Sequence, residues 1–152
     1  MRVAYRVLAY IIAIEVAIQA AVMVFAIAGL GIWVQEGGVF DKAVMESEEP
    51  PFPEVVGFMI HGINGMMIIP AIALLLLIAS FFAKVRRGIV FALVIAALVV
   101  IQIYLGLFGH EAAVFGMLHG INALALFTVA LWAGLRAKKP AGEPAVREHA
   151  PA

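Results

Sequence analysis

The chain has 152 residues, of which 65% are hydrophobic and only 13% are charged, and its formal net charge is zero. A soluble domain is nearer half apolar and about a quarter charged, so the composition indicates a membrane protein. The zero net charge argues against a nucleic-acid partner, and the lack of cysteine excludes disulfides, iron–sulfur clusters and covalent c-type haem.

Four apolar segments are long enough to cross a bilayer as helices, which takes about 20 residues. In chain order they are 7–33, 55–83, 88–108 and 112–135. In lipid their backbones must satisfy their hydrogen bonds internally, and no period-two alternation favours a β-barrel. The sequence therefore predicts an all-α fold, with one four-helix transmembrane domain over residues 1–139 that crosses the cell membrane several times.

The loops differ in charge. The loop 34–54 is acidic with a single lysine, and the turn between the third and fourth segments has no basic residue. The positive-inside rule therefore predicts cytoplasmic termini (N-in, C-in) and an outer 34–54 loop. Residues 140–152, rich in proline, alanine and charge, are predicted to form a disordered cytoplasmic tail. The basic residues lie in three clusters on the predicted inner side: Arg2 and Arg6; Lys84, Arg86 and Arg87; Arg136, Lys138 and Lys139.

An internal repeat links the second and fourth segments. The second opens with VGFMIHGIN, residues 56–64, and the fourth with VFGMLHGIN, residues 114–122. The preceding segments carry a weaker echo, Ile18-Gln19 and Ile101-Gln102. We interpret the chain as two duplicated helical hairpins related by an axis along the membrane normal. The second and fourth helices then run in the same direction, and their histidines are predicted to face each other across the bundle.

Two facing histidines inside a dry bundle favour bis-histidine ligation of a b-type haem. Small residues around each histidine leave room for a flat porphyrin, and each asparagine can bond a propionate, a backbone carbonyl or its twin. The alternative is that small residues permit close helix packing and the histidines join helices. The predicted iron ligands are His61 and His119, and the predicted cofactor-binding residues around them are Gly57, Gly62, Gly65, Gly116, Gly120, Asn64 and Asn122.

The number of residues between each histidine and the next basic cluster opposes this pairing. The first histidine lies about 23 residues before its basic cluster and the second about 17, which at about 1.5 Å per residue is a depth mismatch of roughly 9 Å. Different tilts, a bend at Pro70 or a second helix that protrudes into the cytoplasm could absorb it.

The motifs Ile101-Gln102-x-x-Leu105-Gly106 and Leu118-His119-Gly120-x-Asn122-Ala123 resemble those of a small, mostly actinobacterial family of four-helix membrane proteins. They are also similar to one four-helix half of haem A synthase. The likeness covers residues 7–135. It implies haem ligation near the outer face by His61 and His119, the positions that match the family's ligands. The first outer loop lacks the cysteine pair of many such enzymes, and no residue matches their catalytic carboxylate with certainty.

These observations favour an electron-transfer protein with one low-spin haem b near the outer face. A quinone, a second haem or a redox protein partner would complete the path, and a homodimer could supply one. Two alternatives stay open: a haem-modifying enzyme related to haem A synthase, using an acid such as Glu36, Glu54 or Glu111, and a haem-free accessory or transport subunit. Whether the chain is itself an enzyme is left undecided.

Several other polar and aromatic side chains are candidates for specific roles. Glu15, within the first segment, could serve a proton path, a quinone site or a helix contact. Gln19 and Gln102 are expected to bond between helices. His110 and Glu111 could bind a metal or a propionate, or lie in water. The aromatic residues expected at the membrane interfaces are Trp33 and Phe52 outside, and Tyr5 and Trp132 inside.

Overall fold

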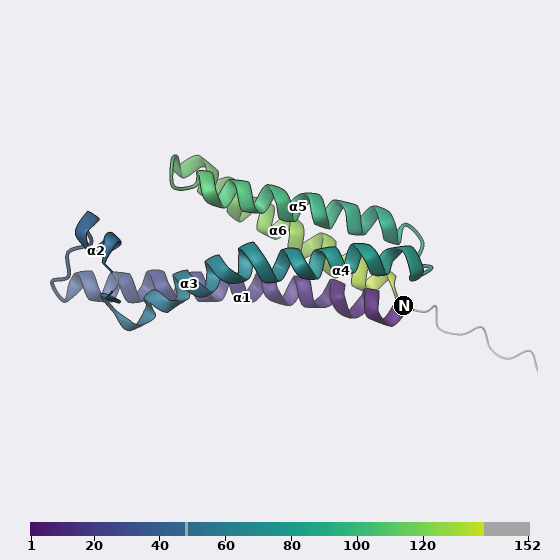
Figure 1. The fold of residues 1–152 in the computed structure, drawn as a ribbon, viewed down its shortest axis with the longest axis horizontal. Helices are drawn as coiled ribbons and strands as arrows, with labels where there is room; N and C mark the ends of the chain where they lie inside the picture. Colours follow the sequence, from purple (N-terminus) through teal and green to yellow (C-terminus); the bar gives the residue numbers. More distant parts are fainter. Residues whose placement is uncertain (48, 139–152) are drawn as a thin grey trace, which may run out of the picture.

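The computed structural model describes residues 1–47 and 49–138, and every regular element in these ranges is helical (Figure 1). The predicted all-α fold with four helices long and apolar enough to span a membrane is confirmed for this part of the chain. The spans are α1 (Arg2–Gln35), a composite second span (Pro53–Phe82), α5 (Gly88–Phe108) and α6 (Ala113–Arg136). The third span has the predicted bounds, whereas α1 begins at Arg2 instead of residue 7.

The second span is not one uniform helix. It consists of the 3₁₀ turn η1 (Pro53–Val55), α3 (Val56–Ile63), the π-helical turn η2 (Asn64–Ile68) and α4 (Ile69–Phe82). The π turn precedes Pro70, which has no N–H to donate and whose ring crowds the carbonyl four residues before it. At the end of η2 the Ile69 N–H donates to the Asn64 carbonyl, five residues back. Such a turn adds one residue to the helix.

The burial pattern supports the duplicated hairpin. Buried positions of α1 recur 83 positions later in α5: Tyr5, Ala9 and Ile12 correspond to Gly88, Ala92 and Ile95. Buried positions of α4 recur 57 positions later in α6, where Ile69, Ala73 and Leu76 correspond to Leu126, Ala130 and Ala133. His61, which lies before the π turn, is separated from its equivalent His119 by 58 positions. The difference of one is the residue that the π turn inserts.

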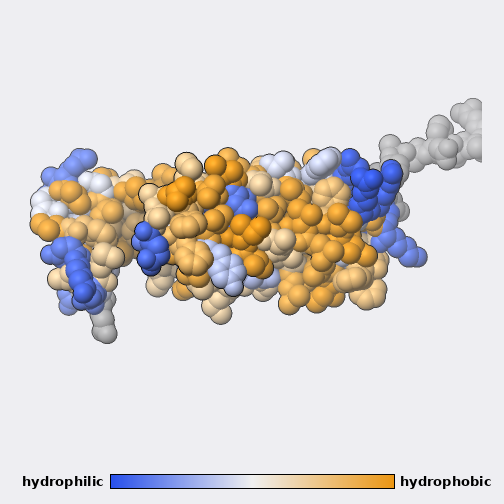
Figure 2. Space-filling model, turned by 90° about the horizontal axis from the view of Figure 1, so that it is seen from above, coloured by the Kyte–Doolittle hydropathy of each residue, from blue (hydrophilic) through white to orange (hydrophobic). Residues whose placement is uncertain are grey.

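The described members of the three basic clusters, Arg2 to Lys138, gather at one end of the bundle, here called the basic end. Arg2 Nη2 donates to the Lys84 carbonyl at 2.5 Å, and Tyr5 donates its hydroxyl to the Gly88 carbonyl at 3.1 Å. Tyr5 is fully buried and its hydroxyl is bonded inside the bundle, whereas its expected depth at the inner membrane interface stays a prediction. Figure 2 shows an apolar band between two hydrophilic ends.

The opposite end, formed by residues 34–47, residues 49–54 and the α5–α6 turn, is called the acidic end. Its loop contains the short helix α2 (Lys42–Glu46), capped by Asp41, whose Oδ1 accepts the Val44 N–H at 3.0 Å. Phe52 is buried against Trp33, with ring centroids 5.7 Å apart, so this part of the loop packs onto the end of α1. The expected place of Phe52 at the outer membrane interface stays a prediction. The predicted tail, 140–152, lies outside the described residues.

The two hairpins pack closely against each other only in the half of the bundle next to the basic end. There α1 packs against α4 and α6, and α4 against α5, around the largest buried side chains: Tyr5, Ile12, Leu76, Ile95 and Leu126. Toward the acidic end the pair α1 and α3 diverges from the pair α5 and α6 (Figure 1). In α6 every buried residue lies at or after Leu126. In the half that carries the repeated motifs, the two hairpins are thus loosely packed against each other.

Candidate functional site

The two repeated histidines meet across the diverging hairpins. The ring centroids of His61, in α3, and His119, in α6, lie 6.0 Å apart with 52° between the ring planes. Both side chains are half-buried. The expected pairing across the bundle is therefore present, and the depth mismatch inferred from residue counts does not keep the rings apart. The second span continues from His61 to Phe82 and α6 from His119 to Arg136, and the π turn adds one residue to the second span.

Each imidazole has one nitrogen fixed by a backbone carbonyl. His61 Nδ1 lies 3.3 Å from the Gln19 carbonyl oxygen, and His119 Nδ1 lies 3.0 Å from that of Gln102. A carbonyl oxygen only accepts, so Nδ1 must carry the proton in both rings. The neutral tautomer then leaves Nε2 with a free lone pair. In the described part of the chain, neither Nε2 has a hydrogen-bond partner.

The same two glutamines return a bond to the histidine backbone. Gln19 Nε2 donates to the His61 carbonyl at 3.2 Å, and Gln102 Nε2 donates to the His119 carbonyl at 3.0 Å. The expectation that both glutamines bond between helices is confirmed. Each hairpin thus holds its histidine by a reciprocal pair of bonds, which fixes the position and the tautomer of the ring together. The Ile-Gln echo in the sequence was the signal for this arrangement.

The two asparagines do not make equivalent bonds. Asn122 Nδ2 donates to the Leu98 carbonyl at 2.9 Å and to Gln102 Oε1 at 2.5 Å. Asn64 Nδ2 donates instead to Glu15 Oε2 at 2.7 Å. The backbone bond of Asn122 is one of the three roles expected from the sequence, whereas the pairing of Asn64 with Glu15 was not expected.

The predicted glycines separate into two groups. Gly57 and Gly65 face α1: a β-carbon on Gly57 would lie 2.5 Å from the Val22 carbonyl oxygen, and one on Gly65 would lie 3.4 Å from Gln19 Nε2. These two permit close helix packing, which is the alternative role that the sequence left open. The second group has open space, because a β-carbon added to any of these glycines would meet no atom within 4 Å: Gly62, Gly116 and Gly120.

Gly106 was not among the predicted site residues, although it stands in the motif of the third helix. A β-carbon there would lie 3.1 Å from His119 Cε1 and 3.2 Å from its Nδ1. The missing side chain lets the imidazole lie against α5 and reach the Gln102 carbonyl. Gly106 lies one turn after Gln102 in α5, but residue spacing alone does not show that the His119 ring packs against this turn.

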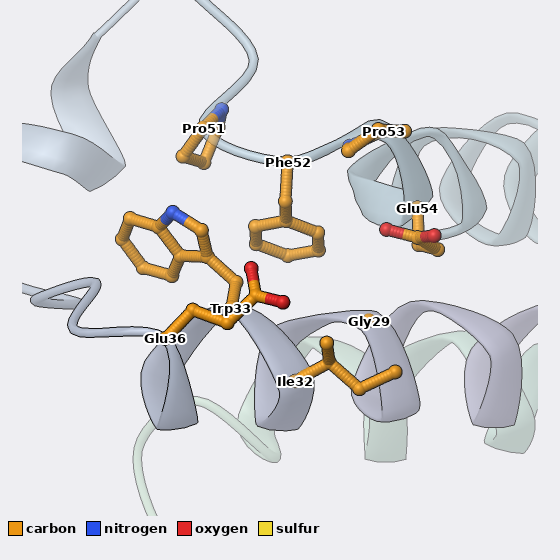
Figure 3. A pocket seen from close by; sticks show the side chains of 8 residues that line it. All are labelled: Gly29, Ile32, Trp33, Glu36, Pro51, Phe52, Pro53 and Glu54. Atoms are coloured by element: carbon orange, nitrogen blue, oxygen red, sulfur yellow. The ribbon is translucent and has the colours of Figure 1, made fainter.

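Other candidate residues lie apart from this hydrogen-bonded cluster. Figure 3 shows Glu36 and Glu54 with Trp33 and Phe52 around a pocket of about 210 Å³ at the acidic end. Glu54 lies over Gly29, where an added β-carbon would overlap it. His110 and Glu111 are exposed in the α5–α6 turn. Within the described ranges, no three His, Asp or Glu side chains group as ligands for one metal ion.

No protein-family model, no curated protein and no solved structure matches this chain.

Proposed function

We propose that this chain is an integral membrane haem protein in which His61 and His119 ligate the iron of one b-type haem, and that it transfers electrons. The observation that carries the proposal is the pair of imidazoles 6.0 Å apart, each with Nδ1 bonded to a carbonyl. Two metal–nitrogen bonds of about 2 Å each, plus the ring radii, put the centroids of trans imidazoles roughly 6 Å apart. The 52° between the planes is compatible with this, because each ring can rotate about its metal–nitrogen bond.

The hydrogen bonds also have the form found around metal-bound histidine. A ligating imidazole almost always donates its other N–H to a carbonyl, a carboxylate or water, which orients the ring and makes the ligating nitrogen more basic. Gln19 and Gln102 supply such carbonyls to both rings. The free nitrogen of each ring is Nε2, the atom that would hold the iron.

A haem suits this site better than a bare metal ion. Structural zinc and most transition-metal sites need about four protein ligands, and the described residues offer only this histidine pair without a third grouped side chain. A porphyrin supplies four nitrogens itself, so two histidines complete six-coordinate iron. The open space at Gly62, Gly116 and Gly120 and the divergence of the hairpins support room for a macrocycle on this half of the bundle.

Six-coordinate iron has no open position for substrate, which favours electron transfer over oxygen chemistry. The distribution of Lys and Arg favours a cytoplasmic basic end, and the histidine pair would then lie in the outer half of the membrane. A quinone or a redox protein would exchange electrons with the haem. The resemblance to haem A synthase leaves a haem-modifying enzyme as the second proposal, in which the bound haem is the substrate.

One observation favours a haem-free bundle. The reciprocal Gln–His bonds would also join helices in the absence of any cofactor, since each bond links two transmembrane segments. This alternative makes an opposite prediction: a stable preparation with no Soret absorption even when the cells are supplied with haem.

The test is the dithionite-reduced minus oxidised spectrum of protein purified from haem-supplied cells. Wild type is expected to hold one b-type haem per chain, and His61→Ala and His119→Ala are each expected to lose the low-spin signal. His110→Ala, which removes an exposed histidine, is the matched control and is expected to keep it. Circular dichroism of each variant checks that the helices persist.

A wild type without haem, or a folded single-histidine variant with an unchanged spectrum, would overturn the proposal. Extraction of the pigment separates the two haem functions. Unmodified haem b supports electron transfer, and a haem that leaves with an altered ring substituent supports the enzyme.

A further inference from the structure

A groove on the outside of the first hairpin combines an apolar wall with two polar side chains. It lies between α1 and the second span and has a volume of about 370 Å³. Its four isoleucines are all exposed, as expected for side chains that face lipid. The two polar groups are the carboxyl of Glu15 and the amide of Asn64. The lining residues are Glu15, Ile18, Ile60, Ile63, Asn64 and Ile68.

The second hairpin shows what the first would look like without this polar pair. Leu98 holds the position of Glu15 there, and Asn122 bonds both the Leu98 carbonyl and Gln102 Oε1. In the first hairpin Asn64 turns to Glu15, and Gln19 Oε1 is left buried without a hydrogen bond among the described residues.

That arrangement is unfavourable for folding alone. A buried acceptor without a partner carries an uncompensated desolvation penalty, and an ionisable group at membrane depth is costly to keep. Both costs come from one residue, Glu15, and its twin position shows that the fold does not need it. A polar pair that the fold does not need, and that lines a groove, indicates a binding site.

The backbone beside the groove also differs between the two hairpins. Asn64 is the first residue of the π turn η2, and single π turns within α-helices occur frequently at functional sites. The corresponding stretch of α6 is regular helix. The carboxyl and the π turn are therefore both found in the hairpin that carries the groove, and the equivalent positions of the second hairpin have neither.

We propose that this groove binds the head group of a membrane quinone. A quinone carbonyl would accept the second amide hydrogen of Asn64, and a quinol hydroxyl would donate to Glu15, while the prenyl tail would follow the isoleucines into lipid. Glu15 lies 13 residues after Arg2, or about 20 Å along the helix. Phospholipid head groups stay at the interface, whereas an uncharged quinone ring can enter the hydrocarbon region.

The groove also adjoins the histidine pair. Asn64 lies one turn after His61 on the same helix, and Gln19, whose carbonyl accepts the His61 N–H, lies one turn after Glu15. The identification of the bound quinone as the redox partner of the haem rests on the proposed function. Binding itself does not, because none of the groove residues is a proposed iron ligand.

The test is photolabelling of the full chain in detergent with a decyl-tailed benzoquinone that carries an azide, followed by peptide mapping. Label is expected in α1 and in residues 56–68, and an excess of unlabelled decyl-benzoquinone is expected to displace it. Glu15→Leu copies the second hairpin, so it is expected to fold at least as stably as wild type and to reduce labelling at least tenfold. Glu111→Leu makes the same chemical change at an exposed position and is expected to keep it.

His119→Ala separates this proposal from the haem proposal. Labelling that persists in this variant is expected, whatever its absorption spectrum. A folded Glu15→Leu protein that labels like wild type, or label displaced by phospholipid but not by the free quinone, would overturn the groove as a quinone site. A wild type without haem that still labels at the groove would overturn the haem proposal alone.

Discussion

The duplicated glutamines allow a test of how much the hydrogen bonds around the histidines stabilise the bundle. The Gln102 side chain makes two hydrogen bonds. Its Nε2 donates to the His119 carbonyl, and its Oε1 accepts from Asn122 Nδ2. Gln19 makes one, to the His61 carbonyl, and its Oε1 is buried without a partner in the described structure. Methionine is unbranched and close to glutamine in length, so Gln→Met removes these bonds with little change in packing.

The two substitutions should therefore differ in effect. A hydrogen bond between membrane helices contributes about 0.6 kcal/mol on average and up to about 1.7, so Gln102→Met is expected to lower the free energy of unfolding by about 1–2 kcal/mol. Gln19→Met loses one such bond but also removes a buried acceptor that costs about 1–3 kcal/mol. We expect its free energy of unfolding to stay within about 0.5 kcal/mol of wild type or to rise.

The assay is SDS-titrated unfolding of haem-free protein in mixed micelles, followed by circular dichroism. A second measurement, Gln102→Met in an Asn122→Ala background, should show a smaller loss, because the bond between these side chains is already absent. Equal destabilisation by Gln19→Met and Gln102→Met would show that the unequal number of hydrogen-bond partners does not set their contributions to stability.

Three further predictions concern backbone and packing. Gly57→Ala places a β-carbon 2.5 Å from a carbonyl oxygen of α1 and is expected to destabilise the bundle by about 1–3 kcal/mol in the same unfolding assay. At Gly62 an added β-carbon would meet no atom within 4 Å, so Gly62→Ala should be neutral or stabilising by up to about 1 kcal/mol. Arg87→Gly is expected to raise the midpoint of thermal unfolding because Arg87 has φ 59°, while Arg86→Gly, which removes the same charge from a residue without positive φ, should lower it. Gly106→Ala presses a methyl group against the neighbouring imidazole, 3.1 Å away, and is expected to shift the haem spectrum or reduce haem content without unfolding the helices; an unchanged spectrum and stoichiometry would contradict this contact.

Much of the fold could be predicted from the sequence because the bilayer restricts the choices. A span must be helical and long enough to cross, so α5 emerged with its observed bounds, Gly88–Phe108. The repeated motif then brought His61 and His119 together without knowledge of any contact, since duplicated hairpins place equivalent residues on related faces. The echo of Ile-Gln likewise indicated that Gln19 and Gln102 act alike.

The departures from symmetry could not be predicted in this way. The π turn at Asn64–Ile68 follows from the strain of Pro70 against its own helix, and a residue count that assumes regular helix misses it. The choice of Glu15 over Gln19 as the partner of Asn64 depends on which acceptor lies closer in three dimensions. The burial of Tyr5 was missed for a similar reason: its hydroxyl bonds the Gly88 carbonyl of another helix, a contact that sequence position does not show.

A structure of haem-supplied protein, with an anomalous difference map at the iron absorption edge, shows whether both histidines bind one iron. We predict a single iron peak between the hairpins, about 2 Å from Nε2 of His61 and of His119. An iron peak bound to one of these nitrogens alone, or located elsewhere in a preparation with one haem per chain, would contradict the account.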